Sequence, residues 1–209
     1  MGQAIAVEEY AGYSITSDDL MKGLFASDET WMLRMDNDGV SYAGFRWKPL
    51  GVWTVAPDWN AQPMCGYGLH GQGQSGHGYT IKGSRIALCA VKVAEIVVVD
   101  GDKIKVPRAR IVAVDDDALR FFGAEFVGSL YLECYAHPLP EGLTHVGGTL
   151  GLQGYAHPLP EGLTHVGGTL DLQGYAHPLP EGLTHVGGSL YLQGYAHPLP
   201  EGLTHVGGT

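Results

Sequence analysis

The sequence predicts a mostly β protein, in which a small α+β domain precedes a parallel β-solenoid. Three observations support this fold class. A block of 14 residues recurs four times with a period of 20, beginning at Tyr135, and a fixed period of this kind indicates a stacked array. Within each period apolar residues alternate, as in a strand with one buried face. The first 122 residues contain no internal repeat, so we place the small domain at 1–122 and a solenoid of about four repeats at 123–209.

The chemistry of one repeat explains why its coils must stack. Residues 170–172 read Leu-Asp-Leu, which gives a strand with one apolar face. Residues 177–180, His-Pro-Leu-Pro, must be extended, because each proline fixes its own φ and restricts the residue before it. Glycines at 182 and at 187–188 allow the corners. One coil cannot bury its own leucines, and stacking at roughly 4.8 Å buries them in continuous columns.

These repeats resemble short leucine-rich repeats of the bacterial and phage type, built on Leu-Pro-x-x-Leu. Residues 159–163 and the strand leucines that follow them carry the resemblance, which covers about residues 126–209. Two features depart from that family. A Gly-Gly pair lengthens each coil, and tyrosines occupy the position of the usual asparagine ladder, namely Tyr155, Tyr175 and Tyr195. The resemblance implies a horseshoe, and the departures leave a straighter β-solenoid open.

One position varies strongly between coils that are otherwise nearly identical. It lies between the two strand leucines, where a side chain points away from the core, and it is occupied by Tyr131, Gly151, Asp171 and Tyr191. The resemblance to leucine-rich repeats implies that this exposed sheet face is a binding face. We therefore predict that this column contacts a partner. Neutral drift at a tolerant surface position is the alternative interpretation.

Eight of the ten histidines also recur with the repeat period and form two columns. The first contains His137, His157, His177 and His197, and the second contains His145, His165, His185 and His205. Periodic histidine can indicate metal binding, but duplication produces a ladder of any residue. We expect solvated or packed histidines here rather than metal ligands, and we expect their close spacing to make the solenoid sensitive to acid.

The N-terminal domain is expected to contain one short helix and several strands, and to cap the solenoid through Phe121, Phe122 and Phe126. Its turns are marked by Asp, Asn, Gly and Pro. The expected elements are a helix at 17–25, a hairpin of 31–35 and 40–47 around the turn 36–39, an ordered loop at 51–65, a strand at 85–93, and a second hairpin of 95–99 and 103–114 with Pro107 at an edge or bulge.

Two elements of this domain resemble a group of uncharacterised phage and viral domains that often precede solenoid repeats. One is Cys-Gly-Tyr-Gly-Leu-His at 65–70, and the other is Lys-Val-Pro-Arg-Ala-Arg at 105–110. The resemblance covers about residues 40–115. It implies a phage-type origin and brings no known activity with it.

Two kinds of chemistry are conceivable in this domain. Cys65 and His70 are candidates for a thiolate–imidazole pair, which would make an activated nucleophile. The same two residues with His77 and Cys89 are candidate zinc ligands of the two-sulfur, two-nitrogen type. We favour a simpler interpretation, with structural cysteines and a hydrogen-bonded loop histidine, because no orienting Asn or Asp can be assigned and the spacing is irregular. No cofactor is expected.

Charge and composition restrict the class of partner. All 12 Lys and Arg precede residue 121, whereas seven carboxylates follow it, so binding of nucleic acid by the solenoid is disfavoured. No run of 18 apolar residues is present, and no membrane span is expected. Three cysteines, an odd and sparse set, fit a reducing compartment, and we expect the cytoplasm of a bacterial host.

These observations favour a non-enzymatic interaction scaffold of phage origin that binds a protein partner through the exposed sheet face. Two alternatives remain: an enzyme with Cys65 and His70 at its centre and the repeats as a targeting arm, or a structural protein of a virion or filament. The strand at 189–193 is expected to be an open edge. Open edges template pairing with another chain, so we also expect a homodimer through residues 189–209.

Overall fold

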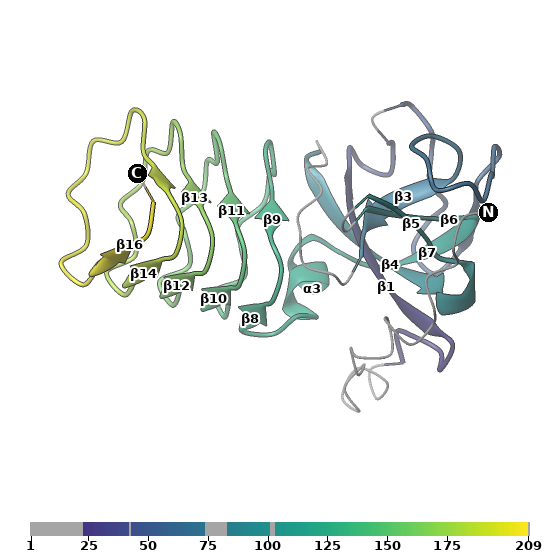
Figure 1. Cartoon of the computed structure of the whole chain (residues 1–209), viewed down its shortest axis with the longest axis horizontal. Helices are drawn as coiled ribbons and strands as arrows, with labels where there is room; N and C mark the ends of the chain where they lie inside the picture. The colour runs from purple at the N-terminus through teal and green to yellow at the C-terminus, as the bar shows by residue number, and fades with distance from the viewer. Residues whose placement is uncertain (1–22, 42, 74–82, 101–102, 209) are drawn as a thin grey trace.

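The computed structural model describes residues 23–41, 43–73, 83–100 and 103–208. It contains an antiparallel sheet of seven strands followed by a solenoid with two parallel sheets. The two parts lie end to end, and the coils stack in a row away from the antiparallel sheet (Figure 1). The predicted fold class, mostly β with a parallel β-solenoid, is confirmed. The helix expected at 17–25 lies mostly outside the described residues.

The antiparallel sheet has the strand order β2-β7-β4-β1-β3-β6-β5. Its strands are β1 (Glu29–Asp36), β2 (Trp53–Val55), β3 (Leu69–Gln72), β4 (Arg85–Lys92), β5 (Val97–Asp100), β6 (Lys103–Val106) and β7 (Arg108–Val114). A one-turn 3-10 helix, Val93–Glu95, follows β4, and the helix α3 (Asp115–Arg120) follows β7. The predicted strand at 85–93 is confirmed. The second predicted hairpin is confirmed only as β5–β6; the rest of its second strand is the separate strand β7, which pairs with β4 and β2. Pro107 ends β6 and separates it from β7, and the predicted loop at 51–65 contains the short strand β2.

The predicted hairpin of residues 31–35 and 40–47 is wrong. The tight turn after β1 forms, but beyond it residues 40–47 make only isolated bridges. Strand β1 pairs along its whole length with β4 and, at Leu33, with β3. Arg85 at the start of β4 holds Asp36 with two hydrogen bonds, of 2.9 and 3.0 Å. The partner of β1 therefore lies 49 to 63 residues further along the chain. Turn residues next to β1 cannot indicate a partner at that sequence separation.

The alternation of side chains along β1 gives the sheet two buried faces. Leu33 and Met35 belong to a core that continues through the leucines of the solenoid. Met32 belongs to a second core on the other face, together with Trp47 and Cys89. The solenoid thus packs against one face of the sheet, and the opposite face has a core of its own.

Aromatic rings join the sheet to the first coil. Phe122 lies 4.7 Å from Phe126 and 5.0 Å from Trp31, and Phe121 lies 5.3 Å from Phe25, measured between ring centroids. The predicted aromatic seal is therefore confirmed.

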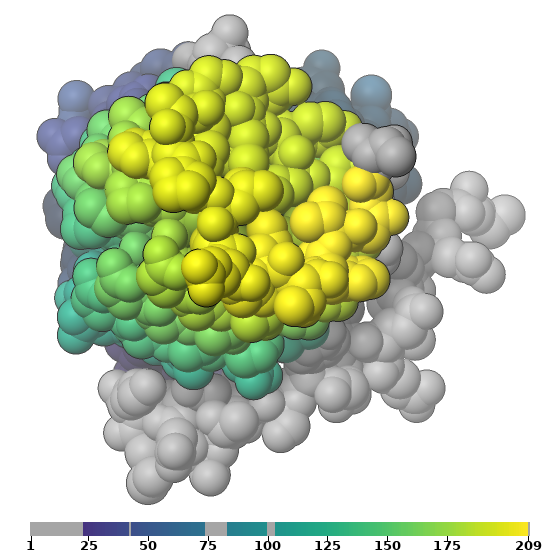
Figure 2. Space-filling model, turned by 90° about the vertical axis from the view of Figure 1, so that its left-hand side faces the viewer, coloured from purple at the N-terminus to yellow at the C-terminus, as the bar shows by residue number. Residues whose placement is uncertain are grey.

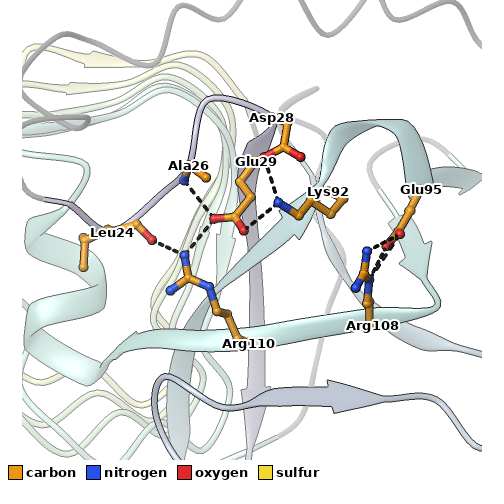
Figure 3. Close-up of polar contacts among 8 residues, drawn as sticks. All are labelled: Leu24, Ala26, Asp28, Glu29, Lys92, Glu95, Arg108 and Arg110. Carbon is orange, nitrogen blue, oxygen red and sulfur yellow. Dashed lines mark hydrogen bonds and ion pairs between the residues drawn. The ribbon is translucent and has the colours of Figure 1, made fainter.

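A group of charged residues holds the start of β1 against β4 and β7 (Figure 3). Glu29, only 4% exposed, accepts hydrogen bonds from the backbone of Ala26 at 2.9 Å and from Arg110 at 2.7 Å, and it lies 3.2 Å from Lys92. Burial by itself raises the pKa of Glu29, but these three partners outweigh it and the pKa lies below its ordinary value. Glu29 is therefore an ionised, buried anchor.

Each coil of the solenoid contributes two short strands, whereas the sequence indicated one. Four His-Val strands and one Glu-Phe strand form a five-stranded parallel sheet of β8 (Glu125–Phe126), β10 (His145–Val146), β12 (His165–Val166), β14 (His185–Val186) and β16 (His205–Val206). The predicted leucine strands form a second, four-stranded parallel sheet of β9 (Leu130–Tyr131), β11 (Leu150–Gly151), β13 (Leu170–Asp171) and β15 (Leu190–Tyr191). Equivalent residues pair in exact 20-residue register, such as Leu150 with Leu170.

The repeated tyrosines form a hydrogen-bonded ladder along the solenoid. The hydroxyl of Tyr175 accepts the backbone N–H of Leu159 in the preceding coil at 2.8 Å. Tyr155 and Tyr195 accept equivalent bonds, of 2.7 and 2.9 Å. The first member of the column, Tyr135, has no preceding leucine of this kind, and its buried hydroxyl has no partner among the described residues. The ladder therefore fastens each coil to the one before it.

The Gly-Gly pairs are required by close stacking rather than by the corners. A Cβ at Gly167 would collide with the carbonyl oxygen of Gly147 in the preceding coil, and Gly187 is related to Gly167 in the same way. The left-handed corner lies elsewhere, after the leucine strand, where Gly174 has φ +77°. In the first, degenerate coil the same corner is formed by Cys134 with φ +67°, a conformation that costs a non-glycine residue energy.

The last coil lies at the far end of the stack (Figure 2). Leu199 in this coil is 52% exposed, whereas its equivalent one coil earlier, Leu179, is 3% exposed. Leu190 and Leu192 are only partly buried. In this 209-residue polypeptide, β15 and β16 are the edge strands of their sheets.

Candidate functional site

The column that varies between repeats lies on the outer side of the leucine sheet. In the first three strands the leucines on either side of it are buried, with Leu170 and Leu172 fully inaccessible, whereas Leu190 and Leu192 in the last strand are partly buried. The column itself runs across four adjacent parallel strands, Tyr131, Gly151, Asp171 and Tyr191. Asp171 is half-buried and Tyr191 is 39% exposed. The structure thus brings the four predicted binding residues into one continuous row.

Contacts along this row order its side chains. A Cβ placed on Gly151 would lie 3.0 Å from the ring of Tyr131, so the ring extends over the glycine. Asp171 accepts a 2.7 Å hydrogen bond from the side chain of Gln153 and a 3.3 Å bond from the backbone of Gln173. The row therefore presents an aromatic ring, a carboxylate held by an amide, and a second aromatic ring.

The first histidine column is structural. The ring Nε2 of His157, His177 and His197 lies 2.8–2.9 Å from an alanine carbonyl oxygen of the preceding coil. A carbonyl only accepts, so each Nε2 carries a hydrogen and donates it. Each ring also lies beside the tyrosine two residues earlier, for example Tyr175 and His177 at 5.6 Å. This column fastens neighbouring coils together, as expected for packed histidines.

The second histidine column is a stack of parallel rings. Ring centroids are 5.5 Å apart between His145 and His165, 4.1 Å between His165 and His185, and 4.3 Å between His185 and His205. The planes of the last two pairs differ by only 3° and 7°. Desolvation lowers the pKa of His185, and the positive charge of its two neighbours when protonated lowers it further. Protonation of His185 is therefore less favourable in the folded column than in the unfolded chain.

This stacked arrangement does not form a metal site. Parallel rings place equivalent nitrogens side by side, whereas a metal requires nitrogens that converge on one point. Across the described residues no group of three or more His, Cys, Asp or Glu side chains is placed to hold a metal ion.

The candidate catalytic and zinc residues of the N-terminal domain lie apart. Cys65 is exposed, and its Sγ accepts a 3.2 Å hydrogen bond from Lys103 Nζ rather than contacting His70. Cys89 lies in the centre of β4, where burial raises the pKa of its thiol to about 12. His70 lies in β3, half-buried, and His77 falls outside the described residues. No nucleophile–base pair is therefore assembled between Cys65 and His70.

Beside His70 the structure shows a pocket that the sequence analysis missed. It has a volume of about 420 Å³, and Arg34, Trp47 and Lys103 line it together with His70. Arg34 and Lys103 belong to β1 and β6, on either side of β3, so these residues meet only because long-range pairing makes the three strands neighbours. Their convergence depends on strand order, which the sequence analysis did not predict.

Comparison with family models, with curated proteins and with solved structures gives no match. Within the described part of the chain, no helix has the length and apolar character needed to cross a membrane. Function is therefore inferred from the geometry of this chain alone.

Proposed function

We propose that this protein is a non-enzymatic interaction scaffold that binds a protein partner through the outer face of the sheet formed by β9, β11, β13 and β15. One observation carries the proposal: the position that differs strongly between nearly identical coils is the one whose side chain points outward from a continuous sheet. A phage origin and a place in the bacterial cytoplasm, which the resemblances suggest, belong to the same proposal.

The chemistry of the row fits a protein surface. Exposed tyrosine is a common interface anchor because it combines a large apolar area with a hydroxyl, and Tyr131 and Tyr191 stand at the two ends of the row. Asp171 adds a carboxylate near the centre. The solenoid carries no Lys or Arg, so a partner with a basic or polar surface fits it better than a nucleic acid does.

The test compares partner capture by the whole chain with capture by two variants, using lysate of the source organism. Tyr131→Ser combined with Tyr191→Ser should lose the captured protein, with a melting temperature close to that of the original chain. The matched control, Glu161→Gln with Glu181→Gln, changes exposed residues off the row and should retain it. Equal capture by both variants would show that the sheet face is not the interface.

We also propose that the polypeptide of residues 1–209 forms a tail-to-tail dimer through residues 189–209. The edge strands β15 and β16 and the exposed Leu199 support this proposal, because unpaired strand edges template pairing with another chain. Light scattering at micromolar concentration should give twice the monomer mass, and Leu192→Lys should restore the monomer. A monomer at about 100 µM, well above the dissociation constant of a specific dimer, would contradict it.

A further inference from the structure

We infer that the pocket beside His70 binds a small organic anion, a phosphate monoester or a carboxylate joined to an aromatic or other apolar body. The pocket lies on the N-terminal domain and uses none of the residues of the proposed solenoid interface. Its volume of about 420 Å³ falls in the range of small-molecule sites. The inference is independent of the proposed scaffold function.

The positive charge of the pocket favours an anion. Arg34 and Lys103 line it together with one carboxylate, Asp58, which accepts a 3.1 Å hydrogen bond from the backbone of Gly68. Lys105 lies next to His70 in the sheet, in the strand paired with β3. Burial lowers the pKa of His70, and the charges of Lys103, Lys105 and Arg34 lower it further. The chain as a whole has a net charge of −10, whereas two cationic side chains, Arg34 and Lys103, line this pocket.

Two buried polar atoms at the pocket lack partners. Trp47 is 4% exposed, and its indole Nε1 has no hydrogen-bond acceptor among the described residues. Nε2 of His70 is also buried and has no hydrogen-bond partner among the described residues. A buried indole N–H without an acceptor costs free energy, and a bound oxyanion would supply the acceptor. Apolar cores normally leave no such groups unpaired, so this pair indicates a site that a ligand completes.

The walls of the pocket favour an apolar body on the ligand. Phe45, Trp47 and Tyr67 line it, and the guanidinium of Arg34 lies over the face of Trp47 at 4.1 Å from the ring centroid. Tyr67 is 49% exposed and has φ +59°. A left-handed conformation at a non-glycine residue is strained and is frequent at ligand sites. Aromatic walls beside fixed cations are suited to a ring that carries a charged group.

The experiment uses the full chain and phenyl phosphate as the probe, followed by calorimetry and by the indole N–H resonance of Trp47. We expect saturable binding with one site and a shift of that resonance. Lys103→Gln should weaken the affinity about tenfold or more, the effect of one charge-assisted hydrogen bond. The matched control Lys48→Gln removes the same charge from an exposed neighbour of Trp47 outside the pocket and should leave the affinity within about twofold.

Two further probes test whether both halves of the ligand are recognised, and a second variant replaces Lys103→Gln if that variant does not fold. Inorganic phosphate and phenol should each bind at least about tenfold more weakly than phenyl phosphate, because each lacks one half of the recognised chemistry. If Lys103→Gln does not fold, Tyr67→Ser tests the apolar wall at an exposed position. The inference is overturned by absence of binding, by equal affinity for either simple probe, or by equal loss in Lys48→Gln.

Discussion

Removing one hydroxyl from the tyrosine ladder should destabilise the solenoid or leave it intact, depending on which coil loses it. Tyr175→Phe removes the acceptor of the buried Leu159 N–H, a bond of 2.8 Å. A buried N–H without an acceptor costs about 1–3 kcal/mol, so we expect a loss of about 2 kcal/mol in the free energy of unfolding. For a chain of this size that lowers the melting temperature by roughly 4–8 °C.

The same substitution at Tyr135 is the matched control. Its hydroxyl is also buried, but it has no partner among the described residues, so Tyr135→Phe removes a desolvated group and breaks no recorded bond. We expect unchanged or slightly increased stability, by up to about 1 kcal/mol. Urea and thermal unfolding of both variants measure the difference. If Tyr135→Phe and Tyr175→Phe lower the free energy of unfolding equally, the tyrosine hydroxyls do not stabilise the stacking of the coils.

Three other perturbations follow from the structure. Cys134→Gly should raise the free energy of unfolding by about 1 kcal/mol, because Cys134 adopts φ +67° at the corner where later coils have glycine. If left-handed geometry is the cause, calorimetry should show no increase in stability for the control Cys65→Gly. Glu29→Gln should cost about 3 kcal/mol, because it leaves Arg110 without its charged partner, whereas Lys92 keeps its ion pair with Asp28. Glu95→Gln, in an exposed pair with Arg108, should cost less than about 1 kcal/mol; similar losses in urea unfolding would contradict this. Desolvation and the neighbouring His165 and His205 lower the folded pKa of His185. The contribution of His185 to the free energy of unfolding is therefore complete above the unfolded pKa near 6.5, and it is lost as pH falls through the folded pKa. A melting temperature that stays flat from about pH 7.5 to 5 would exclude this effect.

The solenoid could be predicted from the sequence because its information is local and repeated. A period of 20 and the alternation at 170–172 determine which leucines are buried. The second sheet, at His165–Val166 and its equivalents, was missed because two residues are too few to show an alternating pattern. The tight coil spacing behind the glycine pair at 167–168 was missed as well, since a glycine in a sequence does not reveal whether it serves a corner or a close approach.

The antiparallel sheet was predictable only in its parts. Turn chemistry located the hairpin β5–β6, whose strands are neighbours in the chain, but it misassigned the partner of β1, which comes from β4. The pocket depends on this order, because Arg34 and His70 face it from strands that are paired but about 36 residues apart. Cys65 and His70 are only five residues apart in the sequence, but the side chain of Cys65 contacts Lys103 rather than His70.

The identity of the coils gives the variable row a role that no other column can have. A partner that touched only repeated residues, such as the Glu141, Glu161 and Glu181 positions, would find the same surface every 20 residues and could bind at several registers with equal energy. Specificity requires a difference in free energy between registers. The row of Tyr131, Gly151, Asp171 and Tyr191 supplies that difference, because it is the position where successive coils differ in size and charge. Deleting residues 135–154, one whole repeat unit that contains Gly151, would keep the remaining coils in register but bring Tyr131 one coil closer to Asp171. A partner that reads the row should lose affinity on this deletion, and one that reads only repeated columns should not.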